Sequence, residues 1–220
     1  MKTYNYKINA TNIAIFFPRE RLKTKKQILK ILLETVRIML IEPSTLRINV
    51  SDSFFKVFID KMSRIFYFTE KKYYSIYFPF TYIVDNGKTI ISYKNEVDIN
   101  SQIISNILEI LNDSRFDSYN SLDFVEPIQE IESNFDGKLW YLIKELLILE
   151  DGYVRFDNDV ENYNKAKIAG KQHTHPENHL DVFYLSGNTF KIGVEAILKT
   201  SEFEDYFNTN TDCKYLKSYK

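Results

Sequence analysis

Apolar residues recur every three or four positions in several segments, which is the spacing of amphipathic helices. The clearest case covers residues 24–41. It ends where Glu42 precedes Pro43, because the residue before a proline is sterically steered out of the helical region. Further helices are predicted over residues 99–111, 124–133, 139–149 and 196–207. Pro127 is expected in the first turn of its helix, where proline is tolerated.

Strand-like alternation and a high density of aromatic and β-branched residues mark residues 46–50 and 54–93. Asn86-Gly87 within this segment predicts a hairpin turn, because both residues tolerate positive φ. Two more strands are predicted at residues 153–159 and 173–184, joined by a polar loop. A turn at residues 186–188 then leads into a further strand over 190–194. This order of elements predicts an α+β protein whose mainly antiparallel sheet is covered on one face by helices.

Composition excludes several classes of protein. The chain has 220 residues, 44% of them hydrophobic and 27% charged, as in ordinary globular proteins. A single cysteine, Cys213, excludes a disulfide scaffold, and with three histidines it excludes Cys₄ and Cys₂His₂ zinc fingers. The apolar stretches fall far short of the roughly 20 residues of a membrane span. The N-terminus lacks the apolar core of a signal peptide, so we expect a cytoplasmic protein without membrane contact.

Charge is distributed unevenly along the chain. Residues 1–94 hold 17 Lys and Arg against 7 Asp and Glu, whereas residues 95–220 hold 12 against 23. The basic half favours nucleic acid as a partner. Alternatively, the two halves attract each other within the fold or between protomers. We expect a basic, aromatic-rich portion at 1–111 and an acidic portion at 112–220, as two domains or as one continuous domain.

All three histidines lie within seven residues, at His173, His175 and His179. In an extended strand alternate side chains share a face, so His179 and Asp181 lie together. The same rule places three polar residues of the preceding strand on one face: Arg155, Asp157 and Asp159. Antiparallel pairing of the two strands would bring both polar faces side by side.

Imidazoles and carboxylates together are ligands for Mn²⁺, Mg²⁺ or Zn²⁺, and such an ion activates water or polarises a phosphoryl oxygen. The pattern therefore indicates a metal-dependent phosphodiesterase or nuclease. Four residues would hold the metal: Asp157, Asp159, His179 and Asp181. His175 would be a further ligand or the general base, and Arg155 would balance the charge of the phosphate.

The alternative is structural: Arg155 pairs with an aspartate across the strands, and the histidines cap local backbone groups. The spacing H-x-H-P-x-x-H is not a named metal motif, and the HExxH signature is absent. The G-x-S-x-G elbow, the Walker A loop and the G-x-G-x-x-G fingerprint are absent too.

The aromatic residues between Phe54 and Tyr82 are interleaved with Lys and Arg. This arrangement could stack bases and contact phosphates of a single strand. The stronger interpretation is the inner face of a sheet, where aromatic residues this dense are mostly found.

At these motifs the chain resembles a known protein family. Arg155-Phe156-Asp157-x-Asp159, followed by His175-Pro176-x-x-His179-Leu180, looks like the C-terminal part of an uncharacterised bacterial family with R-F-D-Y-D and H-P-x-x-H-L. The resemblance covers residues 150–208. The chain departs from the family pattern at Asn158, where an aromatic residue is expected, and after Leu180. Members of the family resemble accessory proteins of mobile elements and defence loci, which implies nucleic acid as the subject.

Two hypotheses follow. The first is a metal-dependent phosphodiesterase or nuclease acting on nucleic acid, in the context of phage defence. The second is a non-catalytic adaptor or regulatory subunit of such a system that binds a protein partner or itself. The second is motivated by the charge division and by the lack of a named catalytic motif.

Overall fold

The computed structural model describes residues 2–18, 22–45, 53–59, 62–70, 72–85, 87–118, 120–134, 137–185 and 188–214. The chain forms two compact units that alternate along the sequence. The sheet unit comprises Met1–Asn9, Thr45–Phe78 and Gly152–Lys220. The helical unit comprises Ala10–Ser44 and Pro79–Asp151. The boundary expected between residues 111 and 112 therefore falls inside the helical unit.

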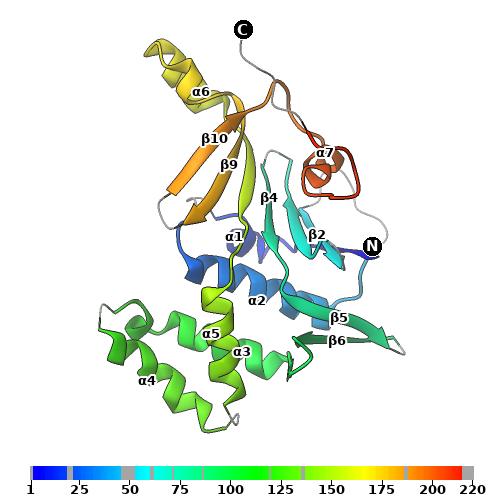
Figure 1. Ribbon diagram of the computed structural model, residues 1–220, viewed down its shortest axis with the longest axis vertical. Helices are drawn as coiled ribbons and strands as arrows, with labels where there is room; N and C mark the ends of the chain where they lie inside the picture. Colours follow the sequence, from blue (N-terminus) through cyan, green and yellow to red (C-terminus); the bar gives the residue numbers. More distant parts are fainter. Residues whose placement is uncertain are drawn as a thin grey trace. The chain divides into compact units, whose positions relative to one another are not determined.

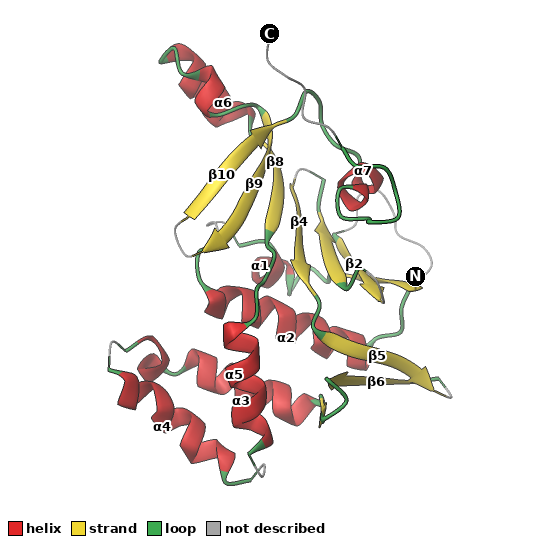
Figure 2. Ribbon diagram, in the orientation of Figure 1, coloured by secondary structure: helices red, strands yellow, loops and turns green. Residues whose placement is uncertain are grey.

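The sheet unit is built on a seven-stranded sheet in which every neighbouring pair is antiparallel. Across the sheet the strands follow the order β1 (Lys2–Lys7), β2 (Phe54–Ile59), β3 (Arg64–Phe68), β4 (Lys72–Tyr77), β8 (Val154–Asn158), β9 (Asn178–Leu185) and β10 (Asn188–Gly193). Helix α6 (Val160–Ile168) and the 3₁₀ turn η2 (Gln172–Thr174) lie between β8 and β9, and α7 (Thr200–Asp205) follows β10. Figure 2 shows β8, β9 and β10 side by side, with α6 extending beyond their ends.

Aromatic side chains form a layer on each face of this sheet. On one face Phe203 of α7 is fully buried and packs edge-on against Phe66 and Phe68, with ring centroids 5.9 and 6.5 Å away. Figure 1 shows α7 close to this part of the sheet. On the other face a row of ring contacts crosses the strands through Tyr6, Phe55, Tyr67, Tyr74, Tyr153 and Phe183. The prediction that the aromatic run forms the inner faces of a sheet is confirmed.

The helical unit combines helices with a small meander. Its elements are α1 (Ile13–Phe16), α2 (Lys25–Ile41), the antiparallel strands β5 (Phe80–Asp85), β6 (Lys88–Tyr93) and β7 (Val97–Asp98), then α3 (Ser101–Asn112), η1 (Ser114–Asp117), α4 (Ser121–Glu132) and α5 (Lys138–Ile148). The α+β class is confirmed, and the sheets are antiparallel. Among the described residues, none of the helices has the length and apolar character required to cross a bilayer.

Local sequence signals explain where several elements begin and end. The side chains of Thr24 and Gln27 form a reciprocal capping box that starts α2, one residue inside the predicted boundary. Gly87 adopts φ +78 between β5 and β6, which confirms the predicted hairpin; its partner Asn86 lies outside the described residues. The predicted strand at residues 46–50 and the turn residues 186 and 187 also lie outside them.

The strand predicted at residues 173–184 begins only at Asn178, after η2, and three predictions about helices are wrong. The segment from Val160 to Gln172, expected as a loop, contains α6, because Asp159 caps the helix and Glu161 pairs with Lys165 one turn later. Asn120 caps α4, so this helix starts early and Pro127 lies in its second turn. The closing helix is confined to Thr200–Asp205 rather than 196–207.

Truncating the buried ring of α7 provides a test of the sheet unit. We expect Phe203→Ala to lower the free energy of unfolding by about 3–5 kcal/mol, because it leaves a cavity among Phe66, Phe68 and Tyr73. The matched control is Tyr206→Ala, whose side chain is exposed and whose loss should cost within about 0.5 kcal/mol. Chemical denaturation measures both, and equal effects would contradict this account of the core.

Candidate functional site

The register of β8, β9 and β10 places polar residues of three strands on one face. Cα pairing sets Arg155 opposite Asp181, and Asp181 opposite Lys191. One step along the strands, Asp157 lies opposite His179. Since alternate residues share a face, these five side chains lie together. The antiparallel pairing of β8 with β9, on which the metal-site hypothesis depended, is present.

Asp181 is the centre of this group, and its carboxylate is almost fully buried, with 1% of the side chain exposed. Arg155 Nη2 donates to Asp181 Oδ2 at 2.7 Å, and Lys191 Nζ donates to Oδ1 at 2.8 Å. The same Arg155 nitrogen lies 2.6 Å from Asp157 Oδ2. Two cations therefore compensate two carboxylates, as buried charges require. The cross-strand pair that the structural alternative predicted is present.

The hydrogen bonds of His179 determine its tautomer. Its Nδ1 lies 2.8 Å from the carbonyl oxygen of Pro176, which can only accept, so Nδ1 carries the proton. Its Nε2 lies 2.6 Å from Lys191 Nζ, which can only donate, so Nε2 presents its lone pair. The Pro176 ring packs closely against Gly193, where a Cβ would lie 3.0 Å from Pro176 Cγ. His179 is thus held as a neutral imidazole whose lone pair is directed at a cation.

Burial and neighbouring charges shift the pKa values of His179 and Asp181 toward the protonation states that these hydrogen bonds indicate. Burial, and then the charge of Lys191, lower the pKa of His179 below its usual value. Burial alone would raise the pKa of Asp181, but the hydrogen bond and charge of Lys191 and the charge of Arg155 outweigh it, so this pKa is lowered. The group therefore has an ionised Asp181 beside a neutral His179.

His175 and Asp159 form a second pair at the end of the same strands. His175 Nε2 lies 3.1 Å from Asp159 Oδ2, and Asp159 also caps α6 by accepting from the backbone of Asn162. The rings of His175 and His179 meet edge to face with centroids 4.9 Å apart. Both members of the pair are partly exposed. A partly exposed imidazole oriented by a carboxylate is the arrangement of a general base.

Three of the candidate residues could hold a metal ion. Asp157, His179 and Asp181 each offer a ligand atom, and these atoms all lie within 4.8 Å of one another. One imidazole and two carboxylates are a suitable ligand set for a divalent transition metal. Asp157 is the most open of the three, with 14% of its side chain exposed.

The structure separates the predicted residues into two sets. Arg155 lies with the three potential ligands, whereas Asp159 lies with His175, because β8 ends at Asn158 and the chain turns into α6. His173 is exposed in η2, where its Nε2 lies 3.4 Å from Gln172 Nε2. Sequence reasoning missed Lys191. The sequence did contain a signal for it, because a hairpin turn was predicted after Asp181. Alternate residues of the returning strand share a face, which places Lys191 on the same face as Asp181.

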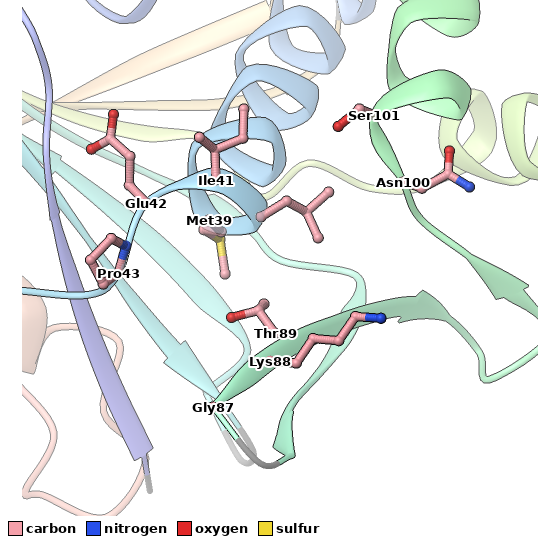
Figure 3. A pocket seen from close by; sticks show the side chains of 10 residues that line it. Met39, Ile41, Glu42, Pro43, Gly87, Lys88, Thr89, Asn100 and Ser101 are labelled. Carbon is pink, nitrogen blue, oxygen red and sulfur yellow. The ribbon is translucent and has the colours of Figure 1, made fainter.

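A separate pocket of about 620 Å³ lies in the helical unit. It is lined by the end of α2, the start of β6 and the start of α3. Figure 3 shows Ile41, Thr89 and Ser101 around it, with Glu42 and Lys88 as its charged residues. None of the six candidate residues lines it, so it is independent of the cluster on β8–β10.

Comparisons with protein-family models, curated proteins and solved structures found no match to this chain. The resemblance of residues 150–208 to a bacterial family therefore stays a prediction.

The buried imidazole predicts a specific pH dependence of stability. Because the pKa of folded His179 is lowered, the unfolded chain binds a proton first as the pH falls through about 6.5. Its contribution is therefore complete above that pH and is lost below it, by at most about 1.4 kcal/mol per pH unit for one proton.

We expect wild-type protein to lose more unfolding free energy between pH 7.5 and pH 5.5 than His179→Gln. Glutamine can still accept from Lys191 but does not titrate. The control is His173→Gln, the same substitution at an exposed histidine, which should keep the wild-type pH dependence. Denaturant titrations at both pH values measure the difference, and identical slopes in wild type and His179→Gln would refute the assignment.

Proposed function

We propose that this protein is a phosphodiesterase that cleaves nucleic acid with a divalent metal ion held by Asp157, His179 and Asp181. The observation that carries the proposal is the convergence of their three ligand atoms beside an imidazole oriented by Asp159. Mn²⁺ and Zn²⁺ suit a ligand set of one imidazole and two carboxylates better than Mg²⁺, which favours all-oxygen sites.

In this reaction the oxygen of water forms a bond to phosphorus, and the bond from phosphorus to the leaving oxygen breaks. The metal would polarise the phosphoryl oxygen. His175 would take the proton of the attacking water on Nδ1, because its Nε2 is engaged by Asp159. The leaving oxygen takes a proton from solvent.

Charge supports an anionic substrate. The residues of the sheet unit, which contains the cluster, include 17 Lys and Arg against 13 Asp and Glu, whereas those of the helical unit include 12 against 17. The unit with the candidate site thus has the positive balance that attracts a polyanion. The resemblance to proteins of mobile elements and phage-defence loci supports nucleic acid as this polyanion.

The test separates metal binding from proton transfer. We expect Asp157→Asn to abolish stoichiometric Mn²⁺ or Zn²⁺ binding, measured by calorimetry on chelator-stripped protein, together with cleavage of labelled single- and double-stranded RNA and DNA. His175→Gln should keep metal affinity within about threefold but lower the cleavage rate by about 10²–10⁴, the usual contribution of a general base.

The control for both is His173→Gln, which removes the exposed neighbouring histidine and should alter neither quantity. Circular dichroism verifies folding of each variant. A wild-type protein that binds neither metal, or a folded Asp157→Asn variant that still cleaves, would contradict the proposal.

A second candidate function, that of a non-catalytic adaptor, is favoured by the β5–β6 hairpin. Ile83 and Ile90 are cross-strand neighbours on one face of this hairpin and are 49% and 38% exposed. Clustered exposed apolar side chains on a hairpin are typical of a protein-binding surface. In this function the protein binds a partner or a second copy of itself.

For the adaptor we expect wild-type protein to self-associate or to bind a protein encoded beside it, and Ile83→Lys to weaken that association at least tenfold. Sedimentation analysis measures the effect. Val84→Lys, the same change at an exposed apolar residue on the opposite face of the hairpin, is the control. A monomeric wild type with no partner would argue against this function.

A further inference from the structure

Lys191 occupies the position that a metal ion would take. Its Nζ lies 2.6 Å from His179 Nε2 and 2.8 Å from Asp181 Oδ1, so it contacts two of the three potential ligands. A metal ion bound to the same two side chains would lie about 2.0–2.2 Å from their ligand atoms. An ammonium group and a metal ion cannot both fill this space, and their charges repel each other.

The net charge of the cluster also argues against Lys191 and a metal ion occupying it together. Two carboxylates, Asp157 and Asp181, are balanced by Arg155 and Lys191. His179 is neutral, because its Nδ1 faces a carbonyl oxygen and its Nε2 faces an ammonium group, so the cluster as it stands is neutral. A divalent ion would leave it with two excess positive charges. Release of Lys191 from the cluster and arrival of a phosphodiester each reduce this excess. Metal binding and anion binding are therefore expected to favour each other.

Lys191 is the member of the cluster that can move. Its side chain is 28% exposed, against 11% for Arg155 and 1% for Asp181. It lies on β10, which is an edge strand of the described sheet. A flexible four-carbon chain on an edge strand can withdraw its ammonium group without rearranging the backbone.

A second, independent observation points to an anionic ligand here. Arg155 is nine-tenths buried, and its Nε has no hydrogen-bond partner among the described residues. A buried donor without an acceptor is costly and rare in proteins. An oxygen of a bound phosphate is an acceptor of the required charge.

We infer that Lys191 exchanges between two partners: it binds His179 and Asp181 in the metal-free protein, and it binds the phosphate of the substrate once a metal ion has taken its place. This inference rests on the proposed phosphodiesterase function and adds a substrate-binding residue to it. Lys191 thereby acts as a competitor of the metal and as a ligand of the scissile phosphate.

The two roles predict opposite effects of one substitution. In Lys191→Met, an apolar side chain of similar length removes the competing charge, so we expect Mn²⁺ to bind at least tenfold more tightly in calorimetry of chelator-stripped full-length protein. The same variant, saturated with Mn²⁺, should cleave the nucleic acid that wild type cleaves at least tenfold more slowly. Loss of a purely structural lysine would not both tighten Mn²⁺ binding and slow cleavage.

Lys167→Met serves as the matched control, since Lys167 is exposed on α6 and should change neither quantity. Where Lys191→Met does not fold, Lys191→Gln, which keeps a neutral donor for Asp181, allows the same two comparisons.

Unchanged Mn²⁺ affinity in the folded variant would overturn the competition, and tighter binding with undiminished cleavage would overturn the role toward the phosphate. Absence of Mn²⁺ binding by wild type and variant alike would instead overturn the proposed metal site, and this inference with it.

Discussion

The buried carboxylate of Asp181 is the constraint on which the organisation of β8, β9 and β10 depends. A charge with 1% exposure is tolerated only when cations and hydrogen bonds replace its lost hydration. Here one cation comes from each flanking strand, Arg155 from β8 and Lys191 from β10. A shift of either strand by one residue would turn its cation to the opposite face, among the aromatic rings around Phe156. The ion pairs therefore specify the strand register as well as compensating charge.

The same compensation limits what the cluster can do. Ligands already engaged by internal cations bind a metal ion only if a cation leaves, so a site of this kind binds more weakly than an open one with the same ligands. His179 Nε2, however, directs its lone pair at Lys191. A purely structural cluster does not need such an imidazole. Nor does it need the oriented pair of His175 and Asp159 at its more exposed end. These two features are the reason for preferring a catalytic function.

Local pattern was sufficient to predict the elements whose signal is periodic. Helix α2, the β5–β6 hairpin and the facing polar residues of β8 and β9 follow from spacing and turn chemistry. Helix α6 was not predicted because it buries no residue and so has no apolar face. Its stability comes from the Asp159 cap and from charge pairing. The pairing of β4 with β8, which joins segments about 80 residues apart and creates the alternating units, has no local signature.

The end of β8 at Asn158 determines which group Asp159 belongs to. Continued alternation along β8 would have placed it with Asp157 among the potential metal ligands. Instead the strand ends at Asn158, and Asp159 becomes the cap of α6, where it also holds His175. The potential ligands thus lie on paired strands, which fix their positions, while the imidazole proposed to transfer protons lies in the connection between them. Since metal geometry requires rigid ligands whereas a proton acceptor must reach water, this division suits metal-assisted hydrolysis better than four ligands in one buried row would.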